Sequence, residues 1–114
     1  MLLKINRIRK KGDFEKIFKN SRSFRSNLFI LRIGKNNLDT NRFGFVVSQK
    51  ISKRAVIRNK VKRRLSDAIR AEIKNIKSGA DVVFIALPGI EKKEFSEIKS
   101  TVENTIIKAG LFLK

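Results

Sequence analysis

The sequence predicts one α/β domain, in which helices and strands alternate along a chain of 114 residues. Three observations predict this class. Apolar residues recur at helical spacing in three segments, apolar runs of strand length stand between them, and glycine-containing turns separate several of these segments. Because neither repeats nor a linker interrupt this order, we expect residues 1–114 to form a single domain.

A basic arm and a short helix are expected at the N-terminus. Residues 1–11 carry five lysines and arginines and little core material, which predicts the arm. Asp13 can begin a helix, and Phe14, Ile17 and Phe18 follow at i, i+3 and i+4 spacing. This pattern predicts an amphipathic helix of about two turns.

Two strands are expected next, at residues 27–33 and 42–48, with a turn at 34–41 that makes them a hairpin. A short strand near Ser23–Ser26 is also possible. Alternation predicts an apolar core face of Phe29, Leu31, Ile33, Phe43, Phe45 and Val47. It predicts a mixed face, open to water or a ligand, of Leu28, Ile30, Arg32, Gly44, Val46, Ser48 and Lys50.

The second half of the chain reads as helix, strand and helix. Apolar residues at helical spacing predict a helix from about Ala55 to Lys77, which Ser78-Gly79 ends. Residues 82–87 are apolar throughout and predict a strand buried on both faces, which Pro88-Gly89 ends. A last helix is expected at Ser96–Ala109.

Charge and composition narrow the function. The chain has 28 lysines and arginines against 10 acids, a net charge of +18, which indicates a nucleic-acid partner or, less often, an anionic membrane surface. It has no histidine and no cysteine, which excludes histidine acid–base catalysis and Cys/His zinc sites. Since neither a signal peptide nor a membrane-length apolar run is seen, we expect a cytoplasmic protein.

The densest basic segment is residues 50–64, where eight of fifteen residues are lysine or arginine. A solvated helix face remains an alternative. However, Arg54, Arg58 and Lys62 put like charges at i, i+4 spacing, which costs stability. At 100° per residue Arg58 also falls on the sheet-facing side, so we expect an anion or acid to receive it. The helix N-terminus itself suits phosphate.

Other candidate residues support binding rather than catalysis. Phe14 and Phe18 either pin the first helix to the sheet or stack on unpaired bases, and both can hold at once. Glu91, Glu94 and Glu97 surround the start of the last helix, where acids stabilise the helix dipole. No convergent set of carboxylates predicts a metal site in the basic region, so phosphodiester chemistry would have to be performed by another molecule.

Three motifs resemble the protein subunit of bacterial ribonuclease P. They are Asp13-Phe14-Glu15-Lys16-Ile17-Phe18, Phe43-Gly44-Phe45-Val46-Val47-Ser48, and Ala55-Val56-Ile57-Arg58-Asn59-Lys60-Val61-Lys62-Arg63. The resemblance covers essentially the whole chain. It implies a two-layer α+β sandwich with a mixed four-stranded sheet and three helices, like the second domain of ribosomal protein S5. It also implies a left-handed β-α-β crossover, against the usual rule.

The resemblance also implies a division of labour. The family's catalytic RNA subunit binds Mg²⁺ and cleaves, and the protein, inactive alone, helps to remove the 5′ leader from precursor tRNA. By position, the residues facing the RNA subunit are Arg54, Arg58, Asn59, Lys60, Lys62, Arg63 and Arg64. Those binding the leader are Arg9, Lys10, Phe14, Phe18, Ile30, Arg32, Val46, Ser48 and Lys50.

Two other functions are alternatives to this one. A ribosomal or other structural RNA-binding protein fits the length and charge, but not the context of Arg58-Asn59-Lys60 or the Phe14 and Phe18 pair. A DNA-binding module would use the basic helix in a major groove. That reading lacks a helix-turn-helix or zipper pattern, so ribonuclease P RNA and precursor tRNA are the expected partners, with neither DNA nor a membrane.

Overall fold

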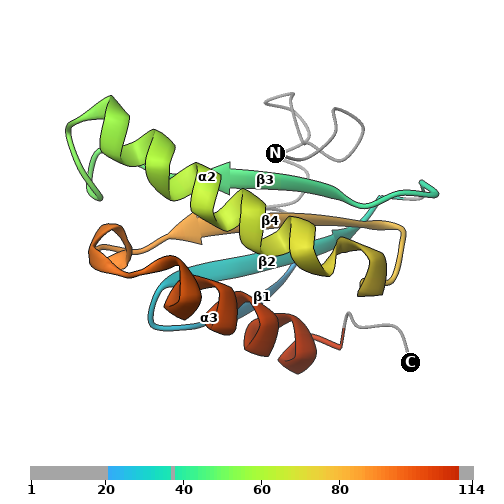
Figure 1. Ribbon diagram of the computed structural model, residues 1–114. Helices are drawn as coiled ribbons and strands as arrows, with labels where there is room; N and C mark the ends of the chain where they lie inside the picture. The colour runs from blue at the N-terminus through green and yellow to red at the C-terminus, as the bar shows by residue number, and fades with distance from the viewer. Residues whose placement is uncertain (1–20, 37, 111–114) are drawn as a thin grey trace.

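The computed structural model describes residues 21–36 and 38–110. Its elements are β1 (Arg22–Arg25), β2 (Phe29–Lys35), β3 (Arg42–Val46), α2 (Ala55–Glu72), the 3₁₀ turn η2 (Ile73–Asn75), β4 (Ala80–Ala86), the 3₁₀ turn η3 (Ile90–Lys92) and α3 (Phe95–Lys108). The four strands form one mixed sheet, and Figure 1 shows α2 and α3 side by side across one of its faces. The predicted α+β class and four-stranded mixed sheet are thereby confirmed.

The sheet has the order β1-β2-β4-β3, and this order corrects one prediction. Residues 27–33 and 42–48 were expected to pair as a hairpin. Instead β4 lies between them, antiparallel to β2 and parallel to β3. The connection from β2 to β3 therefore crosses over one end of β4, which lies between them. Local alternation identifies a strand but not its neighbour, which is why the sequence suggested the shorter pairing.

The core lies between the sheet and the two helices. At its centre the Phe84 ring meets Phe29 edge to face at 5.1 Å and stacks on Phe45 at 5.5 Å. Phe45 is partly exposed, whereas the fully buried side chains of this layer include Phe29, Phe84, Leu31, Phe43, Val61, Leu65, Ile69, Ile98, Val102 and Ile106. Burying each of these side chains contributes about 1.5–3 kcal/mol, so this layer is the main source of stability.

Side-chain alternation holds within the strands and fails just outside them. Ile30, Arg32 and Val46 lie on the face away from the helices, as predicted, and are partly exposed. Leu28 was predicted for the same face, but it is buried in the core, at 2% exposure. It precedes β2 in a bend where the Ser26 hydroxyl accepts the Leu28 and Phe29 amides, so strand alternation does not apply to it.

Both described helices match their predictions closely. The last helix, expected at Ser96–Ala109, spans Phe95–Lys108. The long helix begins at Ala55 as expected but ends at Glu72, and the chain continues as η2 rather than as α-helix to Lys77. Helices commonly tighten into a 3₁₀ turn at their C-terminus. The arm at 1–11 and the third helix, expected after Asp13, lie outside the described residues.

A polar cluster closes the end of the sheet where β4 begins. Arg42 donates two hydrogen bonds to the buried Asp81 carboxylate, Nε to Oδ1 at 2.8 Å and Nη2 to Oδ2 at 2.6 Å. The Asn36 amide donates to the same Oδ1 at 2.9 Å. Next to it, the Ala80 amide donates to Oδ1 of Asn41 at 2.9 Å. These bonds hold the β2–β3 connection against the start of β4. Since β2 and β3 do not pair with each other, the connection is held by β4 and not by a hairpin ladder.

Candidate nucleic-acid interface

The start of α2 presents the positive end of the helix dipole, which, among the described residues, neither a capping side chain nor a first-turn acid offsets. Arg54 occupies the N-cap without a side-chain capping bond, and the first turn contains no acid. The Arg54 carbonyl accepts the Ile57 amide at 3.1 Å and the Arg58 amide at 3.2 Å. The amides at the start of an α-helix carry partial positive charge, which stabilises a nearby anion.

The basic residues of α2 point away from its packed side. Val61, Leu65, Ala68 and Ile69 are buried against the sheet. The exposed residues of the N-terminal half include Arg54, Asn59, Lys60, Lys62 and Arg63, which we call the basic ridge. Five of the seven residues predicted to face an RNA subunit are therefore exposed in or next to the N-terminal half of α2.

Arg58 and Arg64, the other two, are partly buried and bonded to backbone carbonyls. Nη1 of Arg58 donates to the Ser52 oxygen at 3.0 Å and to the Lys53 oxygen at 2.9 Å. The sheet-side position of Arg58 was predicted from helical spacing, its described contacts are these two carbonyls, and an anionic partner for it stays a prediction. Nη1 of Arg64 donates to the Lys93 oxygen at 2.7 Å, which links α2 to the segment before α3.

The second candidate surface is the sheet face away from both helices, which we call the second face. The strand register places Arg25, Ile30, Ile85 and Val46 in one row across the four strands. The adjacent row runs through Ser23, Arg32, Val83 and Gly44. The middle of this face is thus apolar, and guanidinium groups from β1 and β2 stand beside it.

Individual contacts on the second face fix its polar groups. Nε of Arg32 donates to the Ser21 hydroxyl at 2.8 Å, which holds the guanidinium over the sheet. Ser48 and Lys50 are exposed just beyond β3, where the Ser48 hydroxyl accepts the Lys50 amide at 3.2 Å. The chain runs directly from this turn into α2. The residues at the end of β3 are therefore only a few positions away in sequence from the first residues of the basic ridge.

Comparison with known proteins decides the family. The Ribonuclease P family matches residues 2–110. The ribonuclease P protein component of Clostridium acetobutylicum is 37% identical over 113 residues, which cover 97% of this chain and 94% of that protein. The chain belongs to the ribonuclease P protein family.

Solved structures agree with this assignment. The ribonuclease P protein of Staphylococcus aureus has a TM-score of 0.87 at 28% identity, covering 95% of this chain and 98% of that one. The protein from Thermotoga maritima has a TM-score of 0.79 at 30% identity, covering 86% and 92% of the two chains. The ribonuclease P resemblance drawn from three motifs is confirmed.

Four of the predicted leader-binding residues of this ribonuclease P protein, Arg9, Lys10, Phe14 and Phe18, lie outside the described residues. Conversely, the register adds two candidates that sequence reasoning missed. Ile85 is partly exposed between Ile30 and Val46, and Arg25 is exposed at the end of the same row. Because residues 82–87 are apolar throughout, the sequence of β4 does not show that Ile85 faces away from the helices. Arg25 lies in β1, a strand that the sequence predicted only weakly.

The described residues present neither a cluster of metal-ligating side chains nor a membrane-spanning helix. Across residues 21–36 and 38–110, no three acidic, histidine or cysteine side chains gather as metal ligands. The described part of the chain therefore offers no ligand set for the Mg²⁺ that the resemblance implies. In the same residues, neither helix has the length and apolar character needed to cross a bilayer.

Proposed function

We propose that this chain is the protein component of a ribonuclease P that removes the 5′ leader from precursor tRNA, with ribonuclease P RNA as its partner. The observation that carries the proposal is the family match over residues 2–110, together with relatives that are named ribonuclease P protein components. The net charge of +18 and the exposed basic ridge support an RNA partner.

In this proposal the RNA subunit performs the cleavage and holds the Mg²⁺ ions. The sequence contains no histidine and no cysteine, so the protein lacks the side chains that most often serve as general base or thiolate nucleophile. Its contribution is electrostatic binding and positioning of RNA, which orients the substrate before the chemical step. Most of its RNA affinity should therefore fall steeply as salt is added.

We assign the two surfaces to two RNA ligands. The basic ridge, with Arg58 and Arg64 beside it, would contact phosphates of the RNA subunit. The second face would bind the single-stranded leader, because guanidinium planes can both stack on bases and contact phosphates. Arg25 and Ile85 join Ile30, Arg32, Val46, Ser48 and Lys50 in that role. Arg9, Lys10, Phe14 and Phe18 stay predicted leader contacts.

We also propose the finer fold that the resemblance implies, that of the second domain of ribosomal protein S5 with three helices and a left-handed β-α-β crossover. Figure 1 supports the handedness: β3 and β4 point the same way, α2 lies in front of the sheet, and the chain passes from β3 down to β4. The usual right-handed connection would put β4 above β3 in that view. The single-domain organisation and the cytoplasmic location stay predictions.

The test is single-turnover cleavage of a precursor tRNA at low Mg²⁺ concentration. It compares the protein alone, ribonuclease P RNA alone, and the two together. We expect cleavage only where the RNA is present, and much faster cleavage when the protein is added. If the protein leaves the activity of the RNA unchanged, the proposal is wrong, and a ribosomal or other structural RNA-binding role becomes the better assignment.

A further inference from the structure

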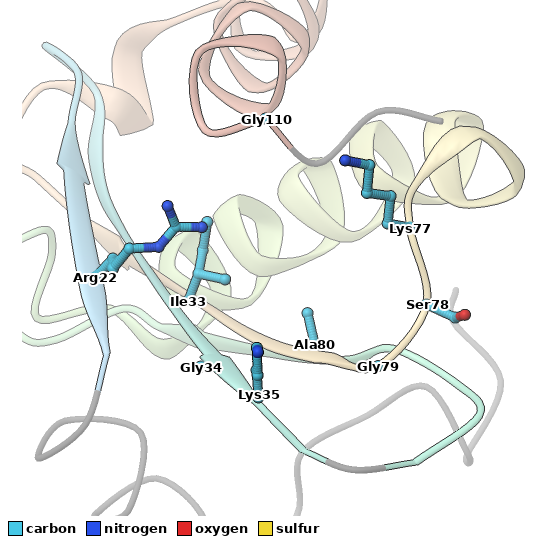
Figure 2. Close-up of a pocket in the computed structure, with 9 residues that line it drawn as sticks. All are labelled: Arg22, Ile33, Gly34, Lys35, Lys77, Ser78, Gly79, Ala80 and Gly110. Carbon is cyan, nitrogen blue, oxygen red and sulfur yellow. The ribbon is translucent and has the colours of Figure 1, made fainter. Parts of the chain in front are cut away.

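A cavity of about 530 Å³ opens at the end of the molecule where α2 and α3 both finish. Figure 2 shows it between β1 and β2 on one side and the segment after η2 on the other, with the end of α3 above it. Its size is in the range of pockets that hold small organic ligands. It shares no lining residue with the basic ridge or with the row of Arg25, Ile30, Ile85 and Val46 on the second face.

Among residues 21–36 and 38–110, the charged side chains that line this cavity are all cations: Arg22 of β1, Lys35 at the end of β2, and Lys77 just after η2. In Figure 2, Arg22 and Lys77 reach from opposite sides toward the same space, and Lys35 lies below them at the end of β2. The Arg22 guanidinium also lies 5.6 Å from the centre of the Phe24 ring, a cation–π contact that orients it. Cations that line one cavity repel one another, and a bound anion relieves that repulsion.

The cavity has room for an anion because glycines form part of its wall. Gly79 and Gly110 have φ angles of +91° and +72°, which favour glycine at both turns. A Cβ atom built on Gly110 would meet nothing within 4 Å, so the space beside it is open. Gly34 adds a third position without a side chain. Cationic side chains around an open, partly backbone-lined space are suited to a phosphate group.

We propose that this cavity binds a backbone phosphate of RNA and so forms a third RNA contact. The inference rests on the proposed function and extends it to the opposite end of the molecule. An α-helix of 18 residues such as α2 is about 27 Å long. An RNA held both by the basic ridge and by this cavity must therefore run along the length of α2, which would fix its direction on the protein.

The first experiment follows amide resonances of the full-length protein by NMR while inorganic phosphate is added. The amides of Gly34, Gly79 and Gly110 report on the cavity, and Gly89, in the turn before η3, reports on a distant site. We expect saturable shifts of the three cavity glycines, and these shifts should be lost in a Lys35→Gln/Lys77→Gln variant. Shifts that are absent, or that persist in this variant, would overturn the proposal.

The second experiment measures binding of ribonuclease P RNA as a function of salt. The control, Lys74→Gln/Lys108→Gln, removes the same charge from exposed basic residues of η2 and of the last turn of α3, neither of which lines the cavity. We expect the cavity variant to lower the slope of log affinity against log salt by about one unit more than the control does. Equal slopes in the two variants would refute the third contact.

Failure of the proposed function and failure of the third RNA contact give different results. If the wild-type protein does not bind this RNA or enhance its cleavage, the proposed function itself is wrong. If the wild-type protein does both and the cavity variant matches the control, only the third contact is wrong. If the cavity lysines only offset the negative ends of helix dipoles, the cavity variant and the control should bind RNA with equal salt dependence. The reason is that Lys74 and Lys108 also lie at helix C-termini.

Discussion

Replacing Asp81 by alanine should be one of the most damaging polar substitutions in the described part of the chain. Its side chain is 7% exposed and receives two hydrogen bonds from Arg42 and one from Asn36. These three bonds hold the connection between β2 and β3 against β4. Since β2 and β3 do not pair with each other, this carboxylate is the main described polar link between the two strands.

The magnitude follows from the contacts. A hydrogen bond to a charged group contributes about 1.5–3 kcal/mol, and breaking a fully buried ion pair from one side costs about 3–5 kcal/mol. The Arg42 side chain is 23% exposed, so water can solvate its guanidinium after the carboxylate is removed. We therefore expect a loss of about 2–4 kcal/mol in the free energy of unfolding. For a chain of this size the loss lowers Tm by roughly 8–16 °C.

The assay is urea unfolding followed by circular dichroism, with Asp39→Ala as the control. Asp39 lies in the same connection and is exposed, so this control makes the same change in net charge without removing the ion pair. We expect the control to change the free energy of unfolding by less than about 0.5 kcal/mol. Equal effects of the two substitutions would refute the structural role of Asp81 and would indicate that net charge alone sets the loss.

Two further predictions concern α2. Leu65→Ala should lower the free energy of unfolding by about 2–5 kcal/mol in a denaturant titration, because the Leu65 side chain is 0% exposed in the core; a loss below 1 kcal/mol would contradict the described packing. Arg64→Ala should cost about 1 kcal/mol of stability by removing the bond to the Lys93 carbonyl, whereas Arg63→Ala, on the exposed ridge, should leave stability within about 0.5 kcal/mol and weaken RNA binding. Thermal unfolding and filter binding of both variants separate the structural role of Arg64 from the RNA-binding role of Arg63. Identical stability losses in the two variants would contradict this difference.

The secondary structure was largely predictable because its signals are local. The apolar period of residues 55–72 and the uniform run of β4 each arise from which side chains are buried, and burial leaves a pattern in the sequence. The order of the strands was not predictable in the same way. The alternation of β2 and β3 does not reveal that β4, which begins at Ala80, inserts between them.

The candidate surfaces show the same division. Helical spacing correctly placed Arg58 at the edge of the buried side, but its partners are carbonyls of Ser52 and Lys53, which every residue carries and no side-chain pattern reveals. Ile85 and Arg25 join the second face only because strand pairing aligns them with Ile30. Local sequence therefore identified the basic residues, but strand pairing was needed to show which residues share a surface.

The central claim is that two separate surfaces bind two RNA ligands. The most direct test measures the affinity of the reconstituted holoenzyme for precursor tRNA with a leader and for the same tRNA without one. The account predicts that Arg32→Ala weakens binding only when the leader is present, and that Arg63→Ala weakens assembly with the RNA subunit regardless of the leader. A loss in Arg32→Ala that is the same with and without the leader would contradict the assignment of the second face.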